Sequence, residues 1–338
     1  AILGGMVLAG GTLAGAFLQW LIQQIAQARA GLGTFRLRFN FKQPGVNDVL
    51  KIMAPATFSS GMLQINLYTD MYFASFIPSA PSGLRYSNIL VQTPLGIISN
   101  ITLLPLLPVF ARLAEPDNWQ ELKLRIRQGL ILTALTMLPM GALMIVLSVP
   151  IVRVVYERGA FTQADSALVS SILVASGLGM FVYLGRDVLV RVFYALGDGE
   201  TPFRISVINI LFNALLDWIF FKPFGAPGLV LATVGVNCIS VLMLLWLLDR
   251  RLNGLPWREW SLPILGLTAG SMVAGTASYG TLEVLQKFLG TNGLLIQLLQ
   301  LAIAGLVGIG VFAVIAASMK LPEVNIFVSR LRQRFLKR

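Results

Sequence analysis

Two carboxylates and one amide lie inside strongly apolar stretches of the chain. Asp70 lies in QINLYTDMYFASF, and Asn213 and Asp217 lie four residues apart in INILFNALLDWIFF. A charged side chain at the centre of a bilayer costs roughly 2.5–3.5 kcal/mol on insertion scales, so such residues usually serve a cation, a proton or a polar substrate. These residue types in this setting predict a polar site inside a membrane transporter.

The spacing of these residues suggests one shared site. Residues four apart lie on one helix face, which pairs Asn213 with Asp217. Thr233 follows on the next apolar segment after KPFGAPG, and short connections make consecutive helices antiparallel neighbours, so we expect it at the same level. Carboxylate, amide and hydroxyl oxygens are hard ligands that suit Na⁺ or another hard cation. Two alternatives remain open: two acids that share a proton, and polar contacts that only join neighbouring helices.

A second polar pattern occurs in LRYSNILVQTPLG, where Arg85, Asn88 and Gln92 recur at spacings of three and four ahead of Pro94. Such a stripe fits the wall of a water-filled cavity. It also fits a polar seam between two helices, because Asn and Gln form hydrogen bonds between membrane helices.

Two arginines occur in a further apolar segment, GRDVLVRVFYALGD, which contains Arg186, Asp187 and Arg191. One interpretation is a cationic wall that faces an anionic substrate. The other is a local ion pair, with arginine side chains that extend toward the cytoplasmic surface near a helix end.

The composition indicates an integral membrane protein. The 338 residues are 56% hydrophobic and 12% charged, with a mean hydropathy of +0.77, whereas soluble domains average about 25% charged residues. The chain has no histidine, which excludes histidine acid–base chemistry and histidine metal ligation. The single cysteine, Cys238, cannot form an internal disulfide. A net charge of +11 is typical of cytoplasmic loops in such a protein and does not indicate a nucleic-acid partner.

The apolar pattern predicts an all-α polytopic membrane protein with nine transmembrane helices. They are expected at residues 2–28, 47–78, 82–112, 122–155, 164–196, 201–222, 227–250, 261–287 and 292–319. Pro105 and Pro108 should kink the third of them. Most of the 26 Lys and Arg residues fall in alternate loops and in the tail, so the first helix should end in the cytoplasm and the C-terminus should be cytoplasmic.

The chain resembles the MurJ family of bacterial lipid II flippases in two ordered sets of motifs. One is RVFYALGDGETPFRISVINILFNALLDW followed by GAPGLVLAT, and the other is LQINLYTDMYFASF followed by TLLPLLPVFARL. The family belongs to the multidrug/oligosaccharidyl-lipid/polysaccharide flippase superfamily, and its members have two six-helix lobes and two extra C-terminal helices. The resemblance implies a fragment that lacks the first five helices. Its parts would be the last helix of an N-lobe (1–28), a cytoplasmic linker (29–46), a six-helix C-lobe (47–250), the extra helix pair (261–319) and a basic cytoplasmic tail (320–338).

The resemblance also implies a Na⁺ site. In this sequence it falls on the side chains of Asp70, Asn213, Asp217 and Thr233 and on the backbone carbonyl of Leu229. The chain departs from the family at one place. Where the family usually has an arginine five residues before the third-helix proline and an acid two residues before it, this chain has Ile89 and Gln92. Arg85, one turn away, is the candidate to replace that arginine.

The expected function is transport, not enzymatic catalysis. The resemblance implies flipping of a polyprenyl-pyrophosphate-linked glycan, lipid II, across the bacterial inner membrane by alternating access. Na⁺ would be the coupling ion and no organic cofactor is expected. The partners would be that lipid, membrane lipids and the missing N-terminal lobe. Three alternatives remain: a cation-coupled multidrug or polysaccharide-lipid exporter, a membrane glycosyltransferase or ligase, and a non-transporting regulatory relative.

Overall fold

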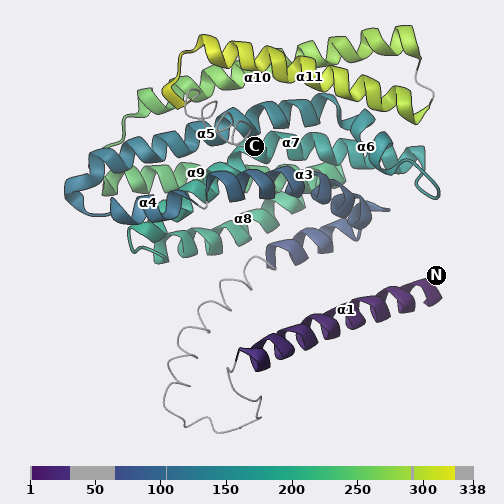
Figure 1. Ribbon diagram of the computed structural model, residues 1–338, viewed down its shortest axis with the longest axis horizontal. Coiled ribbons are helices and arrows are strands. Elements are labelled where there is room, and N and C mark those ends of the chain that lie inside the picture. Colours follow the sequence, from purple (N-terminus) through teal and green to yellow (C-terminus); the bar gives the residue numbers. More distant parts are fainter. Residues whose placement is uncertain (1, 31–64, 104, 291–292, 324–338) are drawn as a thin grey trace. The chain divides into compact units, whose positions relative to one another are not determined.

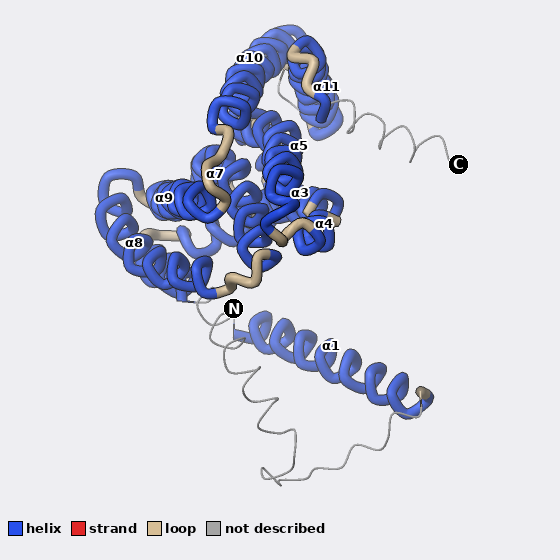
Figure 2. Tube along the Cα trace, turned by 90° about the vertical axis from the view of Figure 1, so that its left-hand side faces the viewer, coloured by secondary structure: helices blue, strands red, loops and turns tan. Residues whose placement is uncertain are grey.

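The computed structural model describes residues 2–30, 65–103, 105–290 and 293–323, and all regular structure in these ranges is helical (Figure 2). The chain divides into two units, Ala1–Thr57 and Phe58–Arg338. The described part of the first unit is α1 (Ile2–Arg29). The predicted linker after residue 30 and the predicted tail after residue 323 lie outside the described residues.

The second unit is an assembly of long helices (Figure 1). It begins with helical residues 65–74 and continues with α3 (Ala80–Thr102), α4 (Leu106–Arg112), the 3₁₀ helix η1 (Pro116–Asn118), α5 (Trp119–Val146), α6 (Ser148–Tyr156), α7 (Gln163–Ala195), α8 (Glu200–Phe224), α9 (Ala226–Arg251), α10 (Trp257–Leu289) and α11 (Leu294–Ser318).

Helix α7 is central to the second unit, because it packs against α3, α5 and α9. Helix α8 covers the outer side of α9, and α10 packs on both α5 and α11 (Figures 1 and 2). The largest apolar core lies among these helices and includes Phe110, Ile126, Met137, Phe193 and Leu244, each fully or almost fully buried.

Glycine determines how closely α5 and α7 approach. A Cβ added to Gly141 would overlap the carbonyl oxygen of Gly177, and a Cβ on Gly177 would meet Ile145 at 2.7 Å. Small residues at such crossings let helix backbones touch, which is a main source of helix association in membranes. The crossing therefore holds α7, which carries Arg186, in a fixed place.

The prediction of an all-α polytopic protein is confirmed for the described part of the chain. Five helices there are long and apolar enough to span a membrane, in α5 (with η1), α7, α8, α9 and α11, and the bent pair of α3 and α4 raises the number to six. Helix α10 is long as well, but its middle is rich in Gly, Ser and Thr (GLTAGSMVAGTASYGT) and therefore less apolar.

Two predicted spans are interrupted. The predicted helix 82–112 bends by 44° between α3 and α4, where Pro105 stands at the start of α4. The prediction of one helix over 122–155 is wrong, because α5 ends at Val146 and α6 begins at Ser148. Pro150 is the reason: its nitrogen carries no hydrogen to donate to the Val146 carbonyl, and its ring disfavours a continuous helix.

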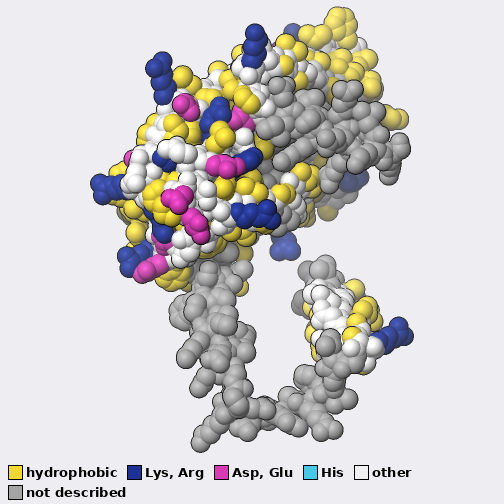
Figure 3. Space-filling model, turned by 60° about the vertical axis from the view of Figure 1, so that its left-hand side comes forward, with side chains coloured by type: hydrophobic (Ala, Val, Ile, Leu, Met, Phe, Trp, Pro, Cys, Tyr) yellow, Lys and Arg dark blue, Asp and Glu magenta, His cyan; other side chains and the backbone are white. Residues whose placement is uncertain are grey.

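Charged side chains gather at the end of the second unit where α7 meets α8 and α9 meets α10 (Figure 3). Pairs of opposite sign occur there, Asp198 with Arg251 and Glu200 with Arg204. The long faces between the two ends of the unit are apolar: Leu211 and Trp218 on α8 and Leu306 on α11 are more than half exposed. This distribution fits helices that lie in lipid with one charged end in water.

Candidate functional site

A cluster of polar groups joins helical residues 65–74 to α8 and α9. It comprises Asp70, Asn213, Asp217, Thr233 and the backbone carbonyl of Leu229, and we call it the polar cluster. The Asn213 amide nitrogen donates to Asp70 Oδ1 at 2.7 Å and to Asp217 Oδ2 at 2.9 Å. The Thr233 hydroxyl lies 3.4 Å from Asn213 Oδ1 and 3.5 Å from Asp70 Oδ2. It also donates to the Leu229 carbonyl at 3.2 Å. The structure thus brings all five predicted groups together.

Apolar packing positions the cluster. The Phe73 ring, three residues after Asp70, lies 5.6 Å from the Phe221 ring of α8. Ala74 is fully buried in one apolar group with Leu229 and Ile172. These contacts fix the helix of Asp70 against α8 and α9, so that its carboxylate faces the i, i+4 pair on α8.

The cluster holds two carboxylates but no positive charge. Asp217 is fully buried and Asn213 is 2% exposed. In the described part of the chain, no Lys or Arg nitrogen lies within 4.0 Å of Asp70 or Asp217. Asp217 Oδ1 is buried and has no hydrogen-bond partner there. Buried charges are normally paired or coordinate a metal. The donor set therefore fits a hard cation.

Sequence reasoning missed neighbours of the cluster on the same helix faces. Asn209, one turn before Asn213, is 5% exposed, and its Oδ1 is buried without a partner among the described residues. On α9, Asn237 donates to the Thr233 carbonyl at 2.7 Å. The signal was present in the sequence, because each lies four residues from a predicted site residue.

The polar cluster opens onto a cavity of about 790 Å³, which we call the central cavity. Asp70 and Thr233 line it together with the α3 stripe, Arg85, Asn88 and Gln92. The three stripe side chains are exposed and have no hydrogen-bond partner within the described ranges. Ile89, which the resemblance described above aligns with an arginine, lines the same cavity. Among the described residues, the stripe lines this cavity and makes no contact of its own with another helix through hydrogen bonds.

Arg186 and Arg191 are placed differently. Arg186 lines the central cavity, and its guanidinium donates to Ser240 Oγ at 3.0 Å and to Ser206 Oγ at 3.1 Å. No carboxylate lies within 4.0 Å of this guanidinium in the described part of the chain, so its direct contacts are with these two serines. Arg191 does not line the cavity. Five residues turn a helix by about 140° beyond a full turn, so the two arginines point to different sides of α7.

Comparisons with known proteins identify the family to which the chain belongs. The sequence profile of the family described as "Lipid II flippase MurJ" matches residues 2–300. A relative from Synechocystis sp., named "Probable lipid II flippase MurJ", is 52% identical over 99% of this chain. The chain belongs to the lipid II flippase MurJ family. A relative of the same name from Rhizobium tropici is 32% identical over 72% of the chain.

A solved structure described as lipid II flippase MurJ in an inward closed conformation matches 84% of this chain with a TM-score of 0.66 and 26% identity. A transporter of the MOP superfamily from Pyrococcus furiosus shares the fold, with a TM-score of 0.50 and 16% identity. The chain spans 63% of the Synechocystis relative and 45% of the Rhizobium relative. It spans 56% of the MurJ structure.

Membership in the MurJ family confirms the prediction of a multi-pass membrane protein from a family of transporters, not of enzymes. Among the described residues, no group of three or more His, Cys, Asp or Glu residues could hold a metal ion. The polar cluster has two acids only, and its other oxygens come from an amide, a hydroxyl and a carbonyl.

Proposed function

We propose that the full-length protein moves lipid II, a polyprenyl-pyrophosphate-linked glycan, across the bacterial plasma membrane by alternating access. The polar headgroup would pass through the central cavity, while the polyprenyl tail stays in lipid. Membership in the family supports the substrate class. The wall formed by Arg85, Asn88 and Gln92 supports a polar path, because polar side chains without partners at membrane depth belong beside water or a polar ligand.

One observation carries the proposal: the polar cluster and the α3 stripe open onto the same cavity. A cation-binding group and a headgroup-binding wall that share one space can influence each other. The coupling free energy between the cation and the headgroup depends on how much more tightly each of them binds one conformation of the alternating-access cycle than the other.

Na⁺ is the proposed coupling ion. The side chains of Asp70, Asn213, Asp217 and Thr233 and the Leu229 carbonyl would hold it, and its charge would neutralise the buried Asp217 and the partly buried Asp70. The Asn213 amide now bridges these carboxylates through its nitrogen. A bound cation would replace that bridge, with the amide oxygen turned toward it.

Arginine is the expected contact for the pyrophosphate, because its planar fork donates two parallel hydrogen bonds to phosphate oxygens. Arg85 is exposed in the cavity and has no partner within the described ranges, so it can turn to a ligand. Arg186 is already held by two serines and would act as a fixed positive charge.

The proposal includes the topology. Nine transmembrane helices would place the C-terminus in the cytoplasm, with the end rich in opposite charges (Figure 3) on the cytoplasmic side. Cysteine-accessibility mapping that found residues 30–46 and 325–338 outside the cell would contradict this orientation.

The experiment is a flipping assay in proteoliposomes with the full-length protein and labelled lipid II. We expect transport that depends on Na⁺ and is lost in Asp217→Ala, whereas Glu200→Gln, an exposed acid on the same helix, should transport normally. The 338-residue chain alone should not transport, because one lobe cannot alternate. Measurable flipping by this chain alone would contradict the two-lobe mechanism.

A further inference from the structure

A second large cavity lies on the other side of α3. It has a volume of about 700 Å³ and is bounded by the first turns of α3, the loop after α6 and the first turns of α7. We call it the outer pocket. It shares no lining residue with the central cavity. Its size lies in the range of small-molecule sites, roughly 300–1,000 Å³.

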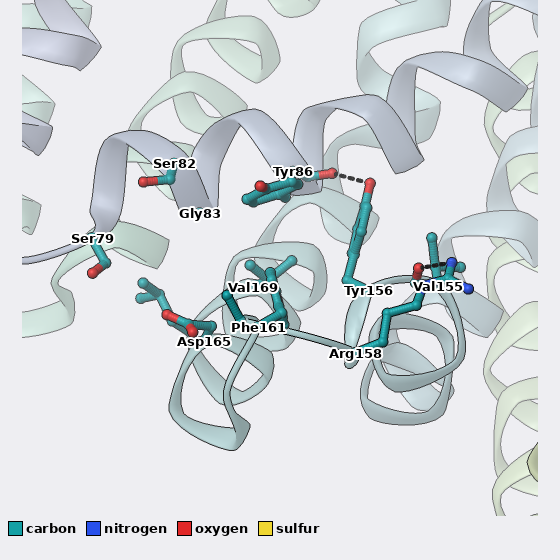
Figure 4. A pocket seen from close by; sticks show the side chains of 12 residues that line it. Ser79, Ser82, Gly83, Tyr86, Val155, Tyr156, Arg158, Phe161, Asp165 and Val169 are labelled. Atoms are coloured by element: carbon teal, nitrogen blue, oxygen red, sulfur yellow. Dashed lines mark hydrogen bonds between the residues drawn. The ribbon is translucent and has the colours of Figure 1, made fainter. Parts of the chain in front are cut away.

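Three aromatic rings form one wall of the outer pocket. The Tyr86 ring lies 5.0 Å from the Tyr156 ring and 5.4 Å from the Phe161 ring, and the last two are 5.7 Å apart. The Tyr156 hydroxyl donates to the Tyr86 carbonyl at 3.1 Å, which ties α6 to α3 (Figure 4). The Tyr86 side chain is 39% exposed, so its ring is available to a ligand.

Polar groups occupy the other end of the pocket. Ser79 and Ser82 lie across from Asp165 (Figure 4). Neither serine hydroxyl has a partner among the described residues. The hydrogen bonds that Asp165 accepts from Thr162 both use Oδ2, so Oδ1 remains for a ligand. Ser79 has φ 60°, a conformation that non-glycine residues adopt rarely and that often marks functional sites.

Charge and ring packing limit what the pocket can take. An anion is disfavoured, because Asp165 faces the space, while the Arg158 guanidinium is folded back onto the Val155 carbonyl at 2.7 Å (Figure 4). An ammonium group binds over ring faces that surround it. Here the three rings pack on one another, with centroids 5.0, 5.4 and 5.7 Å apart, and do not form a cage around an open space. A neutral ring with hydroxyl groups fits both ends: its C–H face can lie on an aromatic ring while its hydroxyls bond to serine and carboxylate oxygens.

We propose that the outer pocket binds a pyranose ring of a glycan. In the topology proposed above, the pocket lies at the extracytoplasmic end of α3, one turn from Arg85 in the central cavity. Two sources share this chemistry: the headgroup of the exported lipid as it leaves the central cavity, and saccharides already outside the cell. The first source rests on the function proposed above, whereas the sugar site itself does not.

The test is saturation-transfer NMR on the 338-residue chain in nanodiscs, with soluble chitotriose and maltotriose as probes and phosphocholine and inorganic phosphate as controls. We expect transfer to sugar ring protons and none to the controls. Tyr86→Leu should weaken sugar binding roughly ten-fold, the loss of one aromatic contact, and Ser82→Ala should also weaken it. Tyr279→Leu removes a half-exposed tyrosine of α10 outside the pocket and should bind as the wild type does.

No transfer to either sugar, equal transfer in Tyr86→Leu, or stronger transfer to phosphocholine would overturn the proposal. The source is decided with the full-length protein in proteoliposomes. If Tyr86→Leu slows lipid II flipping while Tyr279→Leu does not, the pocket receives the exported headgroup. If flipping is unchanged while sugar binding is lost, the pocket takes saccharides from outside. A full-length protein that flips no lipid II would refute the proposed function and leave the sugar result intact.

Discussion

Buried charge is treated in two different ways at two places in this molecule. Where α5 meets the segment after α11, Glu323 is 1% exposed and pairs with Arg127, whose Nη1 lies 2.8 Å from Glu323 Oε1. In the polar cluster, two carboxylates share one neutral amide and meet no cation within the described ranges. The first site is balanced in charge and the second is not.

We interpret this difference as one between a structural role for the balanced pair and the cation-binding role proposed above for the polar cluster. A balanced buried pair keeps two elements together and needs no further charge, since each ion compensates the charge of the other. In the polar cluster, Asp217 is fully buried, while Asp70 is partly buried and lines the central cavity. Two uncompensated carboxylates in such a place lower stability unless a proton or a metal ion compensates them, so we expect them where that ligand has a use. Substitutions at the two places should therefore affect different measurements.

The largest effect on stability is expected at the balanced pair. Arg127→Met leaves Glu323 buried without its cation, which should lower the free energy of unfolding by about 3 kcal/mol or more. Thermal unfolding in detergent measures this. The double variant Arg127→Met/Glu323→Leu should recover most of the loss, because it removes the uncompensated charge. If both variants melt like the wild type, the pair does not hold the C-terminal helices to α5.

The next effect concerns Arg85, a cation that has no carboxylate partner among the described residues. In the full-length protein, Arg85→Ala should reduce lipid II flipping about ten-fold, as expected for the loss of one charge-assisted contact, and it should leave the melting temperature nearly unchanged because Arg85 has no partner in the described ranges. Adding Ile89→Arg to the Arg85→Ala variant should restore part of the flipping activity, since Ile89 lines the same cavity. Normal flipping by Arg85→Ala would show that Arg85 does not bind the pyrophosphate and that residues outside this chain do.

The smallest effect is expected at a partly exposed balanced pair, Asp198 with Arg251. Burial alone would raise the pKa of Asp198, but hydrogen bonds from Thr201 and the Arg251 guanidinium outweigh it and hold the pKa below its ordinary value. Asp198 therefore stabilises the fold above its ordinary pKa, and this contribution disappears as the pH falls through the lowered folded-state value. Asp198→Asn should cost about 1 kcal/mol at neutral pH.

Stability measured against pH checks this sign. The wild type and Asp198→Asn should differ at pH 7 and converge as the solution is acidified below the ordinary aspartate pKa of about 3.9. Arg125→Gln is a matched control, since it removes an exposed i, i+4 pair with Glu121 and should have little effect at any pH. A difference that grows on acidification would contradict this account.

The sequence predicted the polar cluster well for a physical reason. An aspartate or asparagine in an apolar segment is costly wherever it lies, and the i, i+4 spacing of Asn213 and Asp217 fixes their common face on α8. Spacing alone did not show how Asp70 reaches that face. Its position depends on apolar contacts between distant segments, such as Phe73 with Phe221. The resemblance to the MurJ family supplied that link and the Leu229 carbonyl.

Other features could not be found in this way. The Arg127–Glu323 pair joins residues far apart in the chain whose types are ordinary for cytoplasmic loops, so nothing in the sequence marked it. The break before α6 was predictable from Pro150 and was missed. The contacts of Arg186 with Ser206 and Ser240 depend on how α7, α8 and α9 cross. The positions of these serines along the sequence do not indicate how the three helices cross.

The most direct test of the central claim, that the unbalanced cluster is a cation site, is the Na⁺ dependence of thermal unfolding at constant ionic strength, with K⁺ or choline as replacement. Na⁺ should stabilise the wild type by about 1.4 kcal/mol for each ten-fold rise in concentration above its dissociation constant. Asp217→Asn should lose this dependence and, without Na⁺, should melt no lower than the wild type. Glu200→Gln should behave as the wild type does. A wild type that Na⁺ does not stabilise, or an Asp217→Asn variant that Na⁺ still stabilises, would contradict the account.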